Sequence, residues 1–494
     1  MTDIQRCEIR PGHLVEWSLP APTVEAARSV PEDSRPPAYV QEFHLRTARG
    51  ARAAGLCAPS WLGVTCDLPG PVDLDVLERT LHAWMLRHET LRSGFRWRGD
   101  EMRRFTLPAE ALSLRRVELG HFAEPATLVR CLQDRFDRAA DALSWPNFLF
   151  TAVVRPAETS LYLAFDHSNV DAHSIYRIPA EIHQLYTAEL RGRVAELPPV
   201  ASYVDFCATE RAQADAIDGR HPIIDRWREF ITRSGGVMPA FPLDLDLDPE
   251  GPLPTQRFTS ETLVDDRAAT AFERYCRPHG GALVGVLAAT ALVVHELGGQ
   301  ETYRTVVPFH TRAKSRWSDS VGWYVGGVPI EIPIGRASGF DDALEMARSA
   351  LRANRALARV PITRALALLG SDFRFDSPDL CSFVSFVDGR GVPLSERWAE
   401  LRAYGLVRVS YGDRVCVWLT RLHEGVQFAS RFPDTEVAGR NMRLYVERLR
   451  ELVLSVADKP VADGSVANGS VANGSVPAGG SAAREELAAG ALAR

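Results

Sequence analysis

The chain has 494 residues, of which 46% are apolar and 24% charged, a composition typical of a folded globular protein. Its net charge of −6 argues against binding to nucleic acid or to an acidic membrane surface. The basic residues are almost all arginine, and the only two lysines, Lys314 and Lys459, leave little room for Schiff-base chemistry or a P-loop.

Helices and strands alternate along the chain, which predicts an α/β fold. Asp73 is placed to cap a helix that begins at Leu74, because leucines follow it at helical spacing. Residues 161–165 form an apolar run that predicts a buried strand, and residues 174–190 follow as a helix.

The second half continues the same alternation. A nearly all-apolar helix is expected over 281–297, an amphipathic one over 340–357 and a strand over 415–419. Asp434 is expected to cap a last helix that buries Leu444 among other apolar residues.

A proline- and aspartate-rich stretch at residues 239–254 is typical of a connection between two halves. We therefore place an N-terminal lobe at 1–215 and a C-terminal lobe at 216–456. Residues 457–494 repeat the pattern V-A-[DN]-G-S and carry too little apolar surface to form a core. They are predicted to be a flexible low-complexity tail.

Several features bear on cellular context. No apolar run approaches the 18 residues of a membrane span, and the polar first 20 residues do not resemble a secretory signal. We therefore expect a cytoplasmic protein without a membrane span. Eight widely spaced cysteines form no C-x-x-C pair, so we expect neither a disulfide framework nor a metal site.

A group of ionisable residues follows the predicted strand: Asp166, His167 and, four residues after the histidine, Asp171. Strand-to-helix turns are where α/β proteins place reactive groups, which favours a catalytic histidine. Alternatively, Asp171 is only the N-cap of the next helix, accepting from the Ser174 amide. A second H-x-x-x-D, which starts at His221, is interpreted as the capped start of a surface helix.

Competing catalytic motifs are missing. The sequence has no G-x-S-x-G elbow, H-E-x-x-H zinc helix, G-x-G-x-x-G turn or G-x-x-x-x-G-K loop. An imidazole without a nucleophilic partner in the protein suits a reaction in which the substrate supplies the nucleophile. A hydroxyl or amine that attacks an acyl group is such a nucleophile.

Four ordered blocks resemble the HxxxD superfamily of chloramphenicol acetyltransferases and nonribosomal condensation domains. They are the motif itself, R-H-E-x-L-R-x-x-F at 87–95, Y-x-D-F at 203–206, and a pair of blocks at 308–312 and 321–325. The first of the pair matches P-x-x-x-R, and the second, V-G-W-Y-V, resembles the V-G-x-F-V of the family. The chain is most similar to the polyketide-associated PapA-type acyltransferases of actinobacteria. The stretches that carry this likeness are 39–45, 145–149, 167–174 and 430–435.

The resemblance implies two chloramphenicol-acetyltransferase-like α/β sandwich lobes arranged in a V, with a tunnel between them. It implies an acyltransferase that moves an acyl group from an acyl-carrier-protein or coenzyme A thioester to a hydroxyl, in natural-product or glycolipid biosynthesis. His167 would be the general base, the protein is expected to be a monomer, and no cofactor would take part.

The resemblance also implies roles for the residues around His167. Asp171 pairs with an arginine in the family, and Arg92 and Arg312 are the two candidates here. Asp166 replaces a histidine of the peptide-forming members and is a candidate supporting residue. Three further residues are candidates for the tunnel lining, with ordinary packing as the alternative: Trp323, Tyr324 and Ser385.

Two other functions stay open. One is a free-standing, amide-forming condensation protein with an amine acceptor, although the D-F-G-W block of peptide-forming members is missing. The other is a noncatalytic docking module for carrier proteins, against which the retained histidine and aspartate argue. Arg46, Arg49 and Arg52 form a candidate docking patch for an acidic carrier, with a solvated loop as the alternative.

Overall fold

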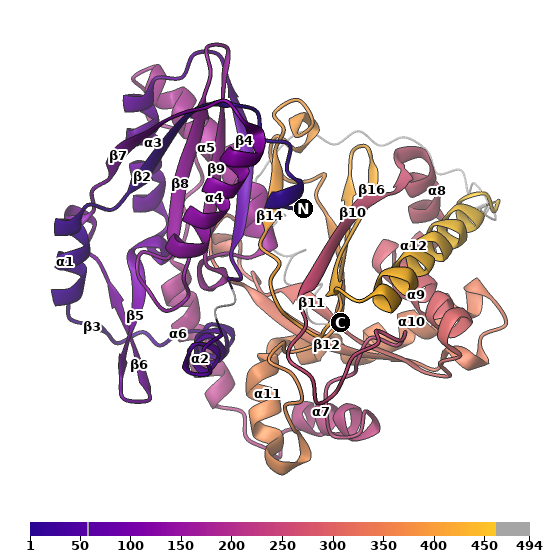
Figure 1. Ribbon diagram of the computed structural model, residues 1–494. Coiled ribbons are helices and arrows are strands. Elements are labelled where there is room, and N and C mark those ends of the chain that lie inside the picture. Colours follow the sequence, from indigo (N-terminus) through magenta and orange to yellow (C-terminus); the bar gives the residue numbers. More distant parts are fainter. Residues whose placement is uncertain (57–58, 461–494) are drawn as a thin grey trace, which may run out of the picture. The chain divides into compact units, whose positions relative to one another are not determined.

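Three β-sheets organise the residues that this computed structural model describes, 1–56 and 59–460 (Figure 1). Two of the sheets carry helices and form the two lobes of a mixed α/β fold, as the sequence predicts. The predicted tail lies outside the described residues from 461 onward.

The first sheet has seven strands in the order β1-β14-β4-β9-β8-β2-β7. Every neighbouring pair is antiparallel except β1 with β14. In sheet order the strands are β1 (Thr2–Asp3), β14 (Tyr404–Val407), β4 (Leu62–Pro69), β9 (Glu158–Phe165), β8 (Phe148–Val154), β2 (Gly12–Ser18) and β7 (Arg115–Phe122).

Helices cover both faces of this sheet. Helices α3 and α5 pack against one face, and α4 packs against the other. The helices of the first half are α1 (Ala21–Ser29), α2 (Tyr39–Ala53), α3 (Leu74–Arg87), α4 (Pro125–Ala139), α5 (Ala172–Leu190) and α6 (Tyr203–Asp215).

The apolar run of β9 follows from its position between these helical layers. Leu161, Leu163 and Phe165 pack in the cluster with α3 and α5, whereas Tyr162 and Ala164 pack in the cluster with α4. Because successive side chains of a strand point to opposite faces, a strand buried on both faces needs apolar residues throughout. The predicted strand is confirmed, and the motif follows directly at its C-terminal end.

A three-stranded sheet in the order β3-β6-β5 completes the first half. Its strands are β3 (Glu32–Asp33), β6 (Glu101–Thr106) and β5 (Ser93–Arg98). The predicted cap of α3 is confirmed, because the Asp73 carboxylate accepts from the amides of Asp75 and Val76.

The second large sheet has six strands in the order β10-β16-β15-β13-β11-β12. Its strands are β10 (Gln256–Asp265), β16 (Gly425–Pro433), β15 (Cys416–Leu422), β13 (Phe383–Asp388), β11 (Tyr303–His310) and β12 (Val325–Ile332). The helices of this half are α7 (Pro222–Arg233), α8 (Asp266–Cys276), α9 (Ala282–Gly298), α10 (Phe340–Asn354), α11 (Ile362–Leu369) and α12 (Glu436–Ala457).

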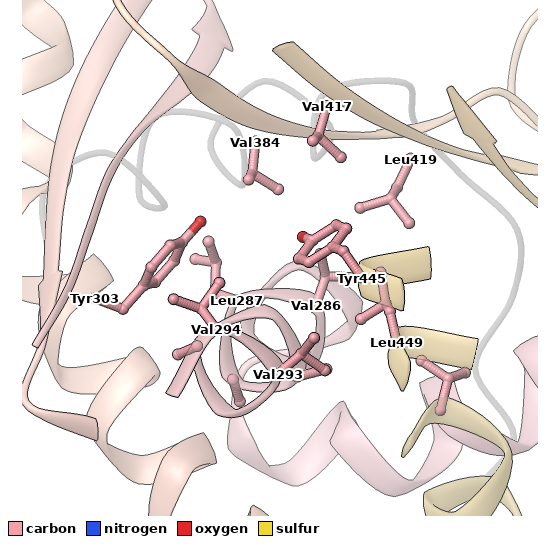
Figure 2. Close-up of a cluster of buried hydrophobic side chains, with 14 of the residues drawn as sticks. Val286, Leu287, Val293, Val294, Tyr303, Val384, Val417, Leu419, Tyr445 and Leu449 are labelled. Carbon is pink, nitrogen blue, oxygen red and sulfur yellow. The ribbon is translucent and has the colours of Figure 1, made fainter. Parts of the chain in front are cut away.

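Helix α9 is apolar all round because it lies inside this lobe. Figure 2 shows its side chains between residues of the sheet and of α12. A helix that faces solvent on one side would carry a polar stripe, which α9 lacks. The labelled side chains are Val286, Leu287, Val293 and Val294 of α9, Tyr303, Val384, Val417 and Leu419 of the sheet, and Tyr445 and Leu449 of α12.

Two expectations about the second half are wrong. The cap of α12 is Thr435, whose side chain accepts from the Ala438 amide, while Asp434 pairs with Arg257 (2.5 Å). Leu444 is 41% exposed, because it lies on the face of α12 that turns away from the core.

The His221 interpretation is confirmed, since its side chain accepts from the Ile223 amide at the start of α7. No helix or strand occurs in the described stretch 239–254 between α7 and β10. The lobe boundary at 215 stays a prediction, with one complication: β14 comes from the second half of the chain but pairs with β4 of the first sheet. In the described part of the chain, no single helix has the length and apolar character to cross a bilayer.

Candidate active site

The H-x-x-x-D motif occupies the turn between β9 and α5. Asp166 caps a one-turn 3₁₀ helix, His167–Asn169, by accepting a hydrogen bond from the Ser168 amide (2.9 Å). Asp171 then caps α5 by accepting from the Ser174 amide (2.8 Å). The two caps fix a sharp turn, because each holds a backbone amide that the adjoining helical turn leaves unpaired.

His167 is half-buried, and its imidazole stacks on the indole of Trp323, with ring centroids 3.9 Å apart and planes 27° from parallel. Among the described residues, Nδ1 is buried without a hydrogen-bond partner, and no protein group hydrogen-bonds to Nε2. Burial lowers the pKa of His167 to about 4, and the nearby charge of His44 adds to the effect. The ring is therefore neutral at pH 7, the form that accepts a proton.

Asp171 is both an N-cap and an ion-pair partner, so the two interpretations of this residue hold together. Arg312 binds it with two hydrogen bonds, from Nη1 to Oδ2 (2.7 Å) and from Nη2 to Oδ1 (2.9 Å). The Tyr324 amide donates a further one to Oδ2 (3.1 Å). Burial alone would raise the pKa of Asp171, but the Arg312 charge outweighs it and holds the pKa below its ordinary value. The Asp171 carboxylate therefore stabilises the turn.

Arg312, and not Arg92, is the arginine that meets Asp171. The Arg312 side chain is 1% exposed, and it also donates to the Ser320 carbonyl (3.2 Å). Arg92 instead donates to the Leu107 carbonyl (2.6 Å). Because Arg312 follows β11, the ion pair joins the motif of the first lobe to the second lobe.

Asp166 is paired with a residue that the sequence analysis did not single out, His44 of α2. The Oδ2 atom of Asp166 lies 2.9 Å from Nε2 of His44, and the aspartate is 1% exposed. Burial alone would raise the pKa of Asp166, but His44 and the two hydrogen bonds from Ser168 outweigh it and lower the pKa. The aspartate that replaces a family histidine therefore has a histidine as its partner.

A second residue of α2 also holds the turn. Gln41 Nε2 donates to the Ser168 carbonyl (2.7 Å), and Gln41 Oε1 accepts from Arg104 (3.1 Å). Asn147 Nδ2 donates to Ser168 Oγ (3.2 Å), and Asn169 donates to Asn147 (2.6 Å). Gln41 and His44 were not predicted as site residues. Their spacing of three residues places two polar side chains on one helix face, but it does not indicate which residues they contact.

The three candidates for the tunnel lining lie in different surroundings. Trp323 contacts His167 directly. Tyr324 is 1% exposed and packs against Tyr203 and under the Arg312 guanidinium, so the structure places it in the core beside the ion pair. Ser385 is a buried residue of β13, opposite Trp418 in the strand register.

The arginines of the candidate docking patch are engaged with neighbouring groups. Arg46 pairs with Glu42 (2.9 Å), Arg49 stacks on Trp97, and Arg52 pairs with Asp141 (2.5 Å). Within the described residues, no group of three or more histidine, cysteine, aspartate or glutamate side chains is arranged to hold a metal ion.

Comparison with known proteins agrees with this geometry. Residues 61–367 match the model of the condensation domain family. The chain belongs to the condensation domain family. The match spans β4 through α11, and so includes the motif turn and Arg312.

The relatives of this chain include PapA-type acyltransferases of mycobacteria. The chain is 30% identical to the trehalose-2-sulfate acyltransferase PapA2 of Mycobacterium tuberculosis H37Rv, over 91% of this chain and 95% of that protein. It is 29% identical to acyltransferase PapA3 of the same strain, over 90% and 94%. A solved PapA2 acyl transferase superposes with a TM-score of 0.84 at 27% identity, over 93% and 99% of the two chains. This condensation-family member is an acyltransferase of the PapA type.

Proposed function

We propose that this acyltransferase moves an acyl chain from a thioester to a hydroxyl group of a carbohydrate, with His167 as the general base. The observation that carries the proposal is the imidazole of His167. It is neutral at pH 7, half-buried, oriented by Trp323, and unpaired at Nε2 among the described residues. The name of the PapA2 relative, a trehalose-2-sulfate acyltransferase, supports a sugar as the acceptor.

The proposed reaction needs one proton acceptor. His167 Nε2 removes the proton of the acceptor hydroxyl as its oxygen attacks the thioester carbonyl carbon. The tetrahedral intermediate then collapses, the C–S bond breaks, and the leaving thiolate takes the proton from His167. The acceptor supplies the nucleophile and the thiolate leaves readily, so the reaction needs no covalent acyl-enzyme. Activation of the acyl group arrives with the donor, as an acyl-carrier-protein or coenzyme A thioester.

The decisive experiment incubates the full chain with an acyl thioester and with trehalose or trehalose-2-sulfate as the acceptor. We expect ester formation in desalted, EDTA-treated enzyme without added nucleotide. His167→Ala should lower the transfer rate by at least about 10²-fold, the usual scale of a general base. Thioester binding should change little, because no described residue hydrogen-bonds to the ring nitrogens.

Two outcomes would contradict the proposal. A His167→Ala variant that keeps most of its turnover would remove the base assignment. A chain that binds acyl-carrier protein but transfers to no alcohol would favour the docking module, and transfer to amines alone would favour the amide-forming protein.

A further inference from the structure

His44 stands beside the proposed base. Its ring centroid is 6.5 Å from that of His167 and 5.6 Å from that of Trp323, which it meets edge-on. Trp323 thus contacts both imidazoles, stacked on that of His167 and in a T-shaped arrangement with that of His44. The three rings converge at the start of the motif turn.

The two imidazoles differ in how they are held. His44 Nε2 is engaged with Asp166 (2.9 Å), while no described protein group hydrogen-bonds to its Nδ1. The His44 side chain is 16% exposed, so it is reachable from outside the core. Burial disfavours its protonation, but the Asp166 carboxylate outweighs burial and raises the pKa of His44.

The neighbouring ionisable groups explain why the pKa of His44 is raised while that of His167 is lowered. Asp166 and His167 are the titratable residues of the turn that face His44, and α2 itself contributes Glu42, which is bound to Arg46 and Arg211. The Asp166 carboxylate therefore pairs with His44, whereas the Asp171 carboxylate pairs with Arg312. The site combines a neutral imidazole with a second imidazole whose protonated form is stabilised.

We propose that His44, as an imidazolium held by Asp166, donates a hydrogen bond from Nδ1 to the thioester carbonyl oxygen during acyl transfer. The inference rests on the proposed function and assigns a second substrate-contacting residue to it. Preorganised donors aimed at the oxygen where charge develops are among the largest contributions to catalysis, and charged donors form stronger hydrogen bonds than neutral ones.

Acyl transfer would then proceed through a tetrahedral intermediate. The acceptor oxygen bonds to the carbonyl carbon, its proton moves to His167 Nε2, and the C=O π electrons move onto the carbonyl oxygen. That oxyanion accepts the hydrogen bond from His44, which keeps its proton throughout. When the C=O bond re-forms, the C–S electrons leave with sulfur, and the thiolate takes the proton from His167.

The ring separation suits these two contacts. The base must lie within about 3 Å of the attacking oxygen, and the donor within about 3 Å of the carbonyl oxygen. Both oxygens are bonded to the same carbon in the intermediate, so the two contacts meet at an angle. Ring centroids 6.5 Å apart leave room for that bent arrangement but are too distant for the two imidazoles to bond directly.

The test compares two site variants with one matched control. His44→Gln keeps a donor to Asp166 but removes the cation. Asp166→Asn keeps an acceptor for the Ser168 amide and removes the charge that stabilises the imidazolium. His279→Gln is the control, because His279 forms an exposed pair of the same kind with Glu345 (2.7 Å) in the second lobe.

We expect kcat to fall by about 10²-fold in His44→Gln, the scale of one lost oxyanion donor, with KM for the thioester within about threefold of wild type. Asp166→Asn should lower kcat in the same direction, and His279→Gln should leave it unchanged. Nitrogen chemical shifts of His44 at pH 7 should report a doubly protonated ring in the wild type and a neutral ring in Asp166→Asn. The spectroscopic readout does not depend on turnover.

A wild-type kcat in folded His44→Gln, or a loss confined to KM, would overturn the assignment. So would a neutral His44 in the wild-type enzyme at pH 7. These failures are distinct from failure of the proposed function, which requires that the wild type transfers no acyl group or that His167→Ala stays active.

Discussion

The Asp171 carboxylate is fixed by a local and a distant part of the chain at once. The amide and hydroxyl of Ser174 bind it within the same turn, and Arg312 binds it from 141 residues away. A buried charge that loses its partner is costly, because the remaining ion keeps its desolvation penalty without the compensating attraction. The motif aspartate should therefore matter for stability as well as for activity.

We predict that Asp171→Ala lowers the free energy of unfolding by about 3–5 kcal/mol, because Arg312 is left buried and unpaired. His167→Ala should lower that free energy by less, since the change removes the stacking on Trp323 but no hydrogen bond to a described residue. Urea denaturation followed by tryptophan fluorescence measures both. Equal unfolding midpoints for the two variants would show that the ion pair contributes nothing to stability.

The pH dependence of the reaction follows from the pKa of His167. Because that pKa is lowered to about 4, the base stays neutral until the pH falls toward 4, and on the acidic side activity is lost only below that range. We predict that kcat/KM at pH 5.5 stays within about twofold of its value at pH 7.5. A histidine with an ordinary pKa of about 6.5 would lose roughly tenfold over this interval. A pH–rate profile, with circular dichroism at each pH to confirm folding, distinguishes the two.

Contacts between sequence neighbours could be predicted, and contacts between distant residues could not. The cap that Asp171 forms with the Ser174 amide was predicted because a strand, a turn and a helix follow one another in the sequence. His44 was missed because it meets Asp166 across 122 residues, and no local pattern records that contact. The choice between Arg92 and Arg312 needed the positions of β5 and β11 in space.

At the scale of elements, the segment 321–325 joins the two lobes beside the site. Gly322 is confined, because a Cβ atom there would lie 2.4 Å from the Tyr203 ring and 2.8 Å from the Tyr324 ring. The Gly322 carbonyl also accepts from Ser174 Oγ (3.0 Å). The next residue is Trp323, so the fit of one glycine sets the position of the indole that stacks on His167.

We predict that Gly322→Ala destabilises the protein by about 1–3 kcal/mol, the usual cost of overpacking, and lowers kcat because Trp323 shifts. Gly391→Ala is the matched control, since a Cβ atom there meets nothing within 4 Å. Thermal unfolding and steady-state kinetics of the two variants provide the comparison. A Gly322→Ala protein with wild-type stability and kcat would show that the segment adapts freely.

At the scale of the whole molecule, the first sheet takes strands from both halves of the sequence. β14 lies between β1 and β4 in the first sheet, although it belongs to the second half. Alternation of helices and strands predicted the α/β class and most elements. It did not predict that β14 joins the first sheet, because the four residues at 404–407 carry no pattern that specifies a sheet.

We predict that residues 1–215 expressed alone do not unfold cooperatively, because β4 lacks its neighbour and Asp171 lacks Arg312. Residues 1–460 should unfold cooperatively under the same conditions. Circular dichroism melting of both chains is the measurement. A sharp transition in the shorter chain would show that the first lobe is independently stable.

The place of β14 also affects how the protein is made. During synthesis, β4 leaves the ribosome some 335 residues before the strand that covers its edge. At about 5–20 residues per second, the delay is roughly 20–70 s. An uncovered strand edge is a template for pairing with other chains. The nascent first lobe is therefore most exposed to aggregation during this interval, and holdase chaperones would have their greatest effect on yield before residue 404 emerges.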